Sequence, residues 1–485
     1  MSAAQTYDFE TKLFINNEYV NSKSARTLEV RNPVDDSLVS SDVQVADAAD
    51  VDLAVAAANA AFKGSWGSLT GHERGELMIK FANLFEEHSK KFCFLETIAM
   101  GMPISVIQVF AALVPRYFRY YAGYADKLEG DAYPADDGVY KFVQYEPLGV
   151  CASVASWNAT PLYLAWKIAP ALATGNTVIF KASEKSPLGA LALGDLFCKA
   201  GFPPGVVNFV TGAGETGHLL ASHMGIRKIS FTGSAAVGRK IQEAATKSNL
   251  KRVTLELGGK SPAIVFDDAD IENALAHCTQ GFLLNSGQIC AAASRTYVHE
   301  SIASTFIAAL TSRYEAASQT LGKPSLDVST SLGPVADKIQ FDRVMSFIDH
   351  GKRDAELIVG GKRKGDKGWF VEPTIFFNPK KGSKIYQEEI FGPVLVVKTF
   401  KTEEEVIDLA NDTEYGLSAC IYTKDIGRAL RVSTSLQTGA IAVNSAFMPN
   451  PSTAFGGFKQ SGNGARESGK YALKDYLEAK TIHIQ

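Results

Sequence analysis

Between residues 177 and 257, short β-branched runs alternate with longer stretches in which apolar residues recur at helical spacing. Four of the runs are predicted to be strands, and three helices are predicted between them. An alternation of this kind predicts a parallel sheet with helices on both faces. The predicted strands are Thr177–Phe180, Val206–Val210, Lys228–Thr232 and Val253–Leu257, and the predicted helices are Leu188–Ala200, Glu215–Met224 and Ala235–Thr246.

A second α/β unit is predicted after this segment. It begins with the apolar run Pro262–Phe266 and continues with a helix from Asp270, the strand Thr296–His299, a long helical region and the strand Val394–Phe400. The segment Glu129–Pro147 differs, because it is polar and places an Asp-Asp-Gly turn between alternating residues. This pattern predicts a β-hairpin, which we expect to protrude from the α/β units as an arm.

The composition indicates a globular protein large enough to contain several such units. The 485 residues are 46% hydrophobic and 21% charged, which excludes a disordered chain, a coiled coil and a disulfide miniprotein. The 49 Lys and Arg residues and the 52 Asp and Glu residues give a net charge of −3. This balance shows no basic footprint of a nucleic-acid-binding protein.

The cysteines and the apolar segments indicate the cellular setting. The six cysteines form no C-x-x-C pair, so neither a disulfide framework nor a metal site is expected, and a reducing compartment is favoured. The first 20 residues contain Asp8 and Glu10 and no apolar core, so we expect no signal peptide. The most apolar long stretch, Val150–Gly175, contains Lys167 and two prolines, so we expect no membrane span.

Two turns between strands and helices are candidates for a dinucleotide site. Gly212–Gly217 matches G-x-G-x-x-G, but position 237, where an acid is expected, is Val. We therefore interpret this turn first as a tight strand-to-helix connection. The next turn, Phe231–Ser234, precedes a helix with Ser234 at its N-cap and Gly238 in its first turn. The free amides of such a helix start bind a pyrophosphate in many proteins, although a capped helix without a ligand fits the same pattern.

Lys181 and Glu184 follow the predicted strand Thr177–Phe180 at the carboxyl edge of the sheet. Ligands of open α/β sheets bind at this edge. A Lys and a Glu three residues apart are therefore candidates for hydrogen bonds to ribose hydroxyls. A surface ion pair is the alternative interpretation.

A cysteine and a glutamate complete the candidate chemistry. Cys290 ends the Gly-containing loop Asn285–Cys290 and is followed by small residues, although a free cysteine is most often simply a buried hydrophobic residue. Glu256 lies between two leucines, before Gly-Gly. A strand-end Glu that points to solvent fits this position, and so does a buried carboxylate with a raised pKa that acts as a general base.

In their order along the chain, these motifs resemble the NAD(P)-dependent aldehyde dehydrogenase family, and the resemblance extends from about Lys12 to Ile484. The interval between Glu256 and Cys290 is 34 residues (290 − 256), which is the spacing that we associate with the family. Each motif alone is weak, whereas the ordered set is specific. The set consists of Trp157-Asn158, Lys181–Glu184, Phe231–Ser234, Leu255–Lys260, Gly287–Cys290, Glu389–Pro393, Phe455–Gly457 and Lys459–Gly462.

The resemblance implies that Cys290 is the nucleophile, which attacks the aldehyde to give a thiohemiacetal. Asn158 and the backbone N–H of Cys290 are then the oxyanion donors, and Glu256 activates the water that hydrolyses the resulting thioester. Lys167 and Glu467 are implied as proton-relay groups. The register of Glu467 differs from the family pattern, because the preceding segment has one residue more than expected.

The resemblance also implies the cofactor contacts and favours NAD over NADP. Lys181 and Glu184 resemble the contacts to the adenosine ribose, where a carboxylate repels a 2′-phosphate. Glu389 resembles the contact to the nicotinamide ribose, and Phe391 packs beside the ring. The other expected cofactor contacts are Trp157, Gly233, Ser234 and Gly238, and no metal is expected.

Two departures from the family pattern concern the substrate. The family string Pro-Trp-Asn-aromatic-Pro reads Ser156–Thr160 here, so Ala159 replaces the aromatic residue, and Ala182 replaces a frequent proline. These two changes resemble the branch that acts on aryl aldehydes. We therefore expect bulky or aromatic aldehydes to enter a tunnel lined by Ala159, Leu162, Tyr163, Trp166 and Phe455.

The sequence thus predicts a cytoplasmic, NAD-dependent, hydrolytic aldehyde dehydrogenase with an α/β fold. We expect a discontinuous Rossmann-like NAD-binding domain of residues 8–128 and 148–258, an α/β catalytic domain of residues 259–458, and a small β arm of residues 129–147 and 474–485. The resemblance implies that the arm mediates a homodimer or homotetramer. The alternative is a catalytically silent relative with a structural or binding role, and the intact Cys290, Glu256 and Asn158 argue against it.

Overall fold

The computed structural model describes residues 7–485. The first six residues, on which the signal-peptide prediction partly rests, lie outside the described part of the chain. No helix within residues 7–485 is long and apolar enough to cross a membrane.

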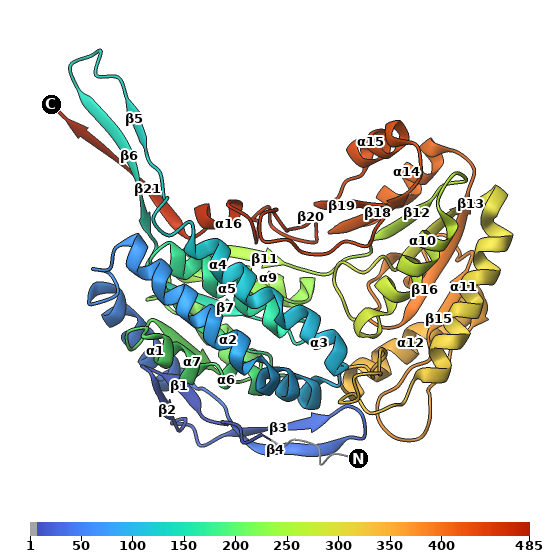
Figure 1. The fold of residues 1–485 in the computed structure, drawn as a ribbon, viewed down its shortest axis with the longest axis horizontal. Helices are drawn as coiled ribbons and strands as arrows, with labels where there is room; N and C mark the ends of the chain where they lie inside the picture. Colours follow the sequence, from blue (N-terminus) through green and yellow to red (C-terminus); the bar gives the residue numbers. More distant parts are fainter. Residues whose placement is uncertain (1–6) are drawn as a thin grey trace.

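Seven strands form the first sheet in the order β11-β10-β7-β8-β9-β1-β2 (Figure 1). The five strands β7 to β11 are parallel, and β1 and β2 add an antiparallel edge. The four strands predicted from residues 177–257 are confirmed, with ends that differ by one residue at most. The bounds are β7 Val150–Val154, β8 Thr177–Lys181, β9 Val207–Val210, β10 Lys228–Thr232, β11 Arg252–Glu256, β1 Leu13–Ile15 and β2 Glu18–Val20.

Helices cover both faces of this sheet. Alternate residues of its strands therefore belong to different hydrophobic clusters. In β8, Val178 and Phe180 pack in the cluster with α2, α4 and α5, whereas Ile179 packs in the cluster with α1, α8 and α9. The bounds are α1 Ala48–Lys63, α2 Gly71–Met100, α3 Ile104–Ala111, α4 Leu113–Ala122, α5 Thr160–Ala173, α6 Leu188–Leu191, α7 Gly194–Ala200, α8 Gly214–Ser222 and α9 Ala235–Lys247.

The helix predicted over Leu188–Ala200 is wrong as a single element, because the structure divides it into α6 and α7. At the junction the backbone forms hydrogen bonds between residues three apart, as in a 3-10 turn. One of them is the 3.1 Å bond from Leu193 N to Ala190 O. Gly194 then lies against the ring of Phe14, where a Cβ atom has no room. The helix predicted to end at Met224 ends two residues earlier, at Ser222.

The second sheet also has seven strands, in the order β14-β15-β16-β13-β12-β18-β19, and all pair in parallel except β14. The long helical region expected between His299 and Val394 is instead two helices, α11 and α12, followed by β14, β15 and the short α13. The bounds are β12 Pro262–Val265, β13 Arg295–His299, β14 Glu356–Val359, β15 Thr374–Phe377, β16 Val394–Phe400, β18 Ser418–Tyr422, β19 Ala440–Val443, α10 Ile271–Ala276, α11 Glu300–Thr320, α12 Lys338–Asp354, α13 Lys384–Gln387, α14 Glu403–Asn411 and α15 Ile426–Ser435.

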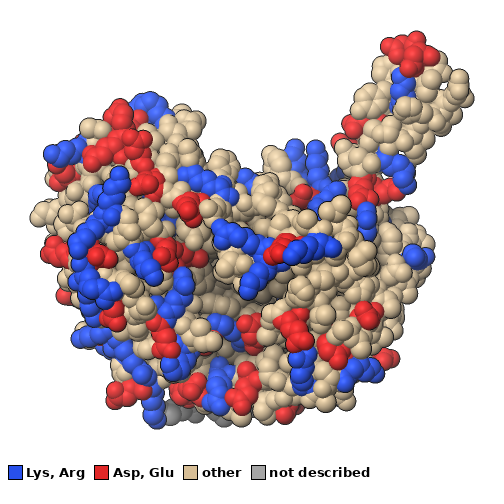
Figure 2. All heavy atoms as spheres, turned by 180° about the vertical axis from the view of Figure 1, so that it is seen from behind, with Lys and Arg blue, Asp and Glu red and all other residues tan. Residues whose placement is uncertain are grey.

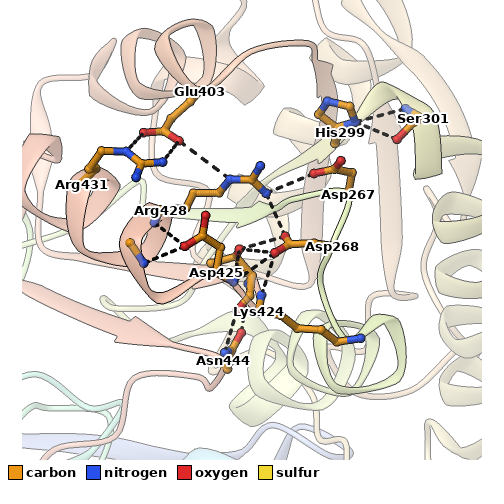
Figure 3. A network of polar contacts seen from close by, with 12 residues as sticks. Asp267, Asp268, His299, Ser301, Glu403, Lys424, Asp425, Arg428, Arg431 and Asn444 are labelled. Carbon is orange, nitrogen blue, oxygen red and sulfur yellow. Dashed lines mark hydrogen bonds and ion pairs between the residues drawn. The ribbon is translucent and has the colours of Figure 1, made fainter.

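Arg428 on α15 connects three elements around the end of the second sheet (Figure 3). Its guanidinium lies 3.1 Å from the carboxylate of Asp267, 2.9 Å from that of Asp268 and 3.8 Å from that of Glu403 on α14. Asp268 also accepts the backbone N–H of Asp425, the N-cap residue of α15. These contacts fix the start of α15 against the segment that follows β12.

A three-stranded arm projects from the first lobe (Figure 1). The hairpin predicted over Glu129–Pro147 is confirmed as β5 Asp131–Tyr133 and β6 Tyr140–Pro147, and β21 Leu477–Ile484 pairs antiparallel with β6. Lys474 lies in α16 Tyr471–Lys474 rather than in the arm. Figure 2 shows acidic side chains at the end of the arm, and basic and acidic side chains interspersed over the rest of that face.

Three shorter features complete the fold. The sequence patterns did not predict them. They are the hairpin of β3 Thr27–Asn32 and β4 Ser37–Gln44, the pair of β17 Tyr415–Gly416 and β20 Phe458–Lys459, and the π-helix η1 His277–Gly281 followed by the 3-10 helix η2 Leu284–Gly287.

Candidate active site

Cys290 lies in a tight loop that follows η1 and η2. Asn285 and Ser286 adopt left-handed φ angles of 50° and 54°, a conformation that is uncommon for residues other than glycine. Gly287 has a φ of 71°, and a Cβ atom there would collide with the carbonyl of Gly392. The loop therefore packs closely on the segment before β16 and fixes the position of Cys290.

The amide of Asn158 is oriented toward this loop. Its Oδ1 accepts hydrogen bonds from the hydroxyls of Ser156 (2.7 Å) and Tyr163 (2.9 Å), and its Nδ2 donates to the carbonyl of Gln288 (3.0 Å). Because Oδ1 already accepts two hydrogen bonds, the donor side of the amide faces the Cys290 loop. The sequence did not point to Ser156 or Gln288 as partners of this amide.

Burial, together with the nearby carboxylates of Glu389 and Glu256, raises the pKa of the Cys290 thiol to about 12. The backbone N–H groups of Ala291 and Cys290 donate to the sulfur and oppose this effect. The thiol is therefore protonated at neutral pH in the free protein. Its ionisation requires a nearby base or a nearby positive charge.

Glu256 is the last residue of β11 and is buried, with 2% of its surface exposed. Neither carboxylate oxygen has a hydrogen-bond partner within residues 7–485. Burial raises the pKa of this carboxyl well above its usual value, and the charge of Glu467 adds to the effect. The interpretation of Glu256 as a strand-end residue that points to solvent is therefore wrong, whereas a buried carboxyl of raised pKa fits.

Lys167 and Glu467 form a buried ion pair beside this carboxyl. The Nζ of Lys167 lies 2.5 Å from Oε1 of Glu467 and donates to Ser230 on β10 at 2.7 Å. The charge of Lys167 lowers the pKa of Glu256, and that of Glu467 raises it. Despite the extra residue before it in the sequence, Glu467 therefore lies next to the lysine with which it was grouped.

A groove beside Cys290 contains most of the predicted cofactor residues. Ser234 caps α9 through a 3.4 Å hydrogen bond from the backbone N–H of Val237. The rings of Trp157 and Phe391 meet edge to face, with centroids 5.4 Å apart. Residues that line the groove are Ser156, Trp157, Asn158, Tyr163, Thr232, Gly233, Ser234, Leu257, Gly258, Cys290, Gln340, Arg343, Glu389 and Phe391.

Glu389 is one of the residues that line this groove. Its Oε1 accepts the backbone N–H of Gly259 at 3.0 Å, and burial raises the pKa of the carboxyl to about 7. A Cβ atom at Gly258 would collide with the carboxylate. Gly238 has a similar steric role on α9, because a Cβ atom there would lie 2.7 Å from Leu257.

Lys181 and Glu184 do not line this groove. Lys181 is buried and donates to the carbonyl of Ala182 at 2.9 Å, and its Nζ lies 3.9 Å from the half-exposed carboxylate of Glu184. Glu184 lines a neighbouring cavity at the turn before α8, together with Ala213 and Thr216. At that turn a Cβ atom on Gly212 would collide with Thr216, so this glycine serves a tight connection.

Cys290 also lines a second cavity. All five residues of the predicted tunnel line it, namely Ala159, Leu162, Tyr163, Trp166 and Phe455. The sequence missed Phe110 and the segment 446–449, which includes Phe447. These residues also line the tunnel and carry no local motif. The ring of Phe455 lies between Trp166 (4.7 Å) and Phe447 (5.6 Å), so the wall is aromatic although Ala159 is small.

The groove and the tunnel meet at Cys290. Asn158, Tyr163 and Cys290 line both cavities. Within residues 7–485, no group of three or more His, Cys, Asp or Glu side chains has the geometry of a metal site.

The chain is similar to known proteins over nearly its whole length. The model of the aldehyde dehydrogenase family matches residues 19–482. An aldehyde dehydrogenase of Davidiella tassiana is 46% identical over 481 residues, which cover 99% of this chain and 96% of the relative. Retinal dehydrogenase 2 of Homo sapiens is 47% identical over 480 residues, with coverages of 98% and 92%. The NAD⁺ complex of an aldehyde dehydrogenase from Bacillus cereus has a TM-score of 0.95 at 39% identity, with coverages of 98% and 96%.

Proposed function

This chain belongs to the aldehyde dehydrogenase family and is an aldehyde-oxidising enzyme that uses NAD, and we propose that it forms a carboxylic acid through a cysteine thioester that water hydrolyses. The observation that carries this proposal is the position of Cys290, which lines both the groove and the tunnel. A nucleophile at this junction is exposed to a cofactor on one side and to an aldehyde on the other.

The groove fits a dinucleotide. The capped start of α9 offers backbone N–H groups to a pyrophosphate, and Gly233 and Ser234 line the same wall. Glu389 offers a carboxylate to ribose hydroxyls, beside the aromatic pair of Trp157 and Phe391. NAD bound here supplies the acceptor for the hydride that leaves the substrate carbon.

The first half of the proposed reaction takes place on Cys290. Its thiolate attacks the aldehyde carbon, and a C–S bond forms while the carbonyl π electrons move onto oxygen. Nδ2 of Asn158 and the backbone N–H of Cys290 stabilise this oxyanion. When the carbon–oxygen double bond re-forms, hydride leaves the carbon, and a thioester on Cys290 remains.

The second half requires a general base, for which we propose Glu256. Its ionised carboxylate takes a proton from a water molecule, the hydroxide adds to the thioester carbon, and the cysteine thiolate leaves with the release of the acid. Lys167 and Glu467 are proposed to carry the proton away, because they form an ion pair in contact with Ser230 beside this carboxyl.

Further assignments remain proposals. We propose that Glu184 disfavours NADP, that aromatic aldehydes are accepted, that residues 8–128 with 148–258 and residues 259–458 are separate domains, and that the arm joins two or four copies of the chain. We also propose a cytoplasmic location. The proposed domain boundary at residue 258 falls in the connection between β11 and β12, which belong to different sheets.

The proposed function is tested by incubating the purified protein with NAD and a panel of aldehydes while NADH absorbance and the acid product are both measured. Cys290→Ala is expected to reduce NADH formation by roughly three orders of magnitude or more, while NAD binding by calorimetry changes little. The matched control is Cys198→Ala, which removes a cysteine that lines neither the groove nor the tunnel. If no aldehyde yields NADH, the alternative of a catalytically silent relative is favoured.

A further inference from the structure

His277 lies in the wall of the tunnel that leads to Cys290. It is the first residue of the π-helix η1, where α10 widens and Phe282 N donates to the carbonyl of His277 five residues earlier. Single π-turns inside helices are rare and occur frequently at functional sites. The π-turn therefore gives His277 a backbone setting that an uninterrupted helix does not provide.

The imidazole of His277 is held by stacking rather than by hydrogen bonds at Nδ1. Its ring lies 5.9 Å from the ring of Tyr422, at an interplanar angle of 25°. Nδ1 is buried and has no hydrogen-bond partner within the described chain. A buried polar nitrogen without a partner costs free energy. A ligand in the tunnel meets the imidazole where the residue lines the wall.

Two other polar groups of the tunnel wall are already engaged. The hydroxyl of Tyr163 donates to Oδ1 of Asn158 at 2.9 Å, and the hydroxyl of Tyr422 donates to the carbonyl of Ser445 at 3.3 Å. Most of the remaining wall is aliphatic or aromatic. Among the buried side-chain nitrogens of this wall, those of Trp166 and His277 have no partner within the described chain. The indole can only donate, so His277 is the one of these two residues that can also accept a hydrogen bond from a substrate.

The charge state of His277 determines which kind of substrate group can hydrogen-bond to it. Burial lowers the pKa of this imidazole from its usual value, so the ring is neutral at pH 7 and offers one N–H donor and one nitrogen acceptor. A neutral ring of this kind complements a hydroxyl group, which both donates and accepts. It offers no ion-pair partner to a carboxylate.

We propose that His277 is a specificity-determining residue that hydrogen-bonds a neutral hydroxyl group at the end of an aromatic aldehyde opposite to its carbonyl. This proposal rests on the proposed function, because it assigns the tunnel to the aldehyde. The aromatic wall formed by Trp166, Phe455 and Phe447 contacts the substrate ring, and Cys290 receives the carbonyl.

Two pairs of substrates of different length test the proposal. The first pair is 4-(hydroxymethyl)benzaldehyde and 4-ethylbenzaldehyde, and the second is 4-(hydroxymethyl)cinnamaldehyde and 4-ethylcinnamaldehyde. The members of each pair have nearly the same shape and differ only in that a methyl group replaces the hydroxyl group. The measured quantity is the ratio of kcat/KM for the hydroxyl compound to kcat/KM for the ethyl compound.

We expect the wild type to prefer the hydroxyl compound of at least one pair by about fivefold or more, and His277→Phe to abolish this preference. Phenylalanine keeps the ring that stacks on Tyr422 and removes both nitrogens. His277→Asn, which restores a donor and an acceptor, is expected to retain part of the preference and serves as the second variant if His277→Phe is unstable. The matched control is His88→Phe on the exposed face of α2, which should leave both ratios unchanged.

The outcomes separate this proposal from the proposed function. If the wild type oxidises the ethyl compounds with NAD but shows no preference in either pair, the role of His277 is wrong and the proposed function stands. The same conclusion follows if His277→Phe keeps the wild-type ratio. If no compound yields NADH, the proposed function itself fails, and this proposal fails with it.

Discussion

Burial controls the protonation of the two side chains that we propose to carry the chemistry. It raises the pKa of the Cys290 thiol to about 12 and the pKa of the Glu256 carboxyl well above its usual range. The Cys290 thiol is therefore protonated at neutral pH in the free protein, and Glu256 holds its proton to a higher pH than an ordinary carboxyl. Each group has to lose its proton before it acts as nucleophile or base. The rate of the reaction is expected to depend on pH through both groups.

Glu256→Gln is expected to block hydrolysis of the thioester more than its formation. Glutamine keeps the shape of the side chain and removes the base. Rapid mixing with NAD and an aldehyde should then show a burst of NADH close to the active-site concentration, followed by a steady state slower by about two orders of magnitude or more. Loss of the burst itself would place Glu256 in an earlier step, such as the ionisation of Cys290.

The pH dependence of the step after the burst follows from the raised pKa of Glu256. A general base acts in its ionised form, and the ionised fraction rises as the pH approaches the pKa from below. The rate of thioester hydrolysis should therefore keep increasing with pH in the range above the usual pKa of a carboxyl, where an ordinary glutamate is already ionised. Quench-flow measurement of acid release tests this, and an equally steep increase in Glu256→Gln would contradict the assignment.

Glu184→Gln is expected to narrow the preference for NAD. In the wild type, repulsion between this half-exposed carboxylate and a 2′-phosphate should favour NAD over NADP by about tenfold or more in kcat/KM, or about 1.4 kcal/mol. The matched control is Glu215→Gln, which removes the same charge from an exposed residue of the same cavity. Equal use of both cofactors by the wild type would overturn the role of Glu184.

At the scale of elements, buried parallel strands were predicted best. β10 and β16 have the predicted bounds, Lys228–Thr232 and Val394–Phe400. Their neighbours in the sheet cover both edges and helices cover both faces, so every residue of β10 and most residues of β16 are buried. The local sequence predicts such a strand because burial on every side restricts the residue types that its positions accept.

Other elements depend on distant partners and had no local signal. Strands β1 and β2 have three residues each, too short for a recognisable period, and form because β1 pairs with β9. The break between α6 and α7 depends on contact with Phe14, far away in the sequence. The π-helix η1 differs from an α-helix in its hydrogen-bond pattern, which a spacing of apolar residues does not reveal.

The residue at the start of α5 is expected to set the width of the tunnel. Ala159 is the N-cap residue of α5 and lines the tunnel, and the hydrogen bond from Tyr163 to Asn158 keeps the tyrosine from filling the space. Ala159→Phe is therefore expected to lower kcat/KM most for a benzaldehyde, less for hexanal and least for acetaldehyde, by about 10-fold to 200-fold for the bulkiest. Ala159→Leu should give an intermediate series. An equal loss for all three aldehydes would show that Ala159 does not shape the tunnel.

At the scale of the molecule, the candidate site combines segments that the sequence motifs identified with segments that they did not. Glu256 ends a strand of the first sheet, and the loop of Cys290 precedes β13 of the second sheet. Ordered motifs were sufficient to group these residues, whose roles stay predictions. Phe110 on α3 and Phe447 after β19 reach the same tunnel only through the packing of the two lobes, and no local pattern predicts such a contact.

The arm is expected to hold copies of the chain together. β21 is an edge strand that pairs with β6 on one side, and exposed edge strands are templates for pairing with another chain. Tyr140 and Ile484 face each other across the register and are 62% and 55% exposed. Burial of such apolar side chains against a second arm would stabilise an assembly.

We therefore expect light scattering after gel filtration to give the wild type two or four times the chain mass of 52.2 kDa. The double variant Tyr140→Ser and Ile484→Ser should shift the mass toward one chain at low micromolar concentration, because it removes apolar surface from the arm without changing either lobe. Met224→Ser, which alters an exposed apolar residue outside the arm, should keep the wild-type mass. A wild type that elutes as a single chain, or a double variant with unchanged mass, would show that the arm does not hold the copies together.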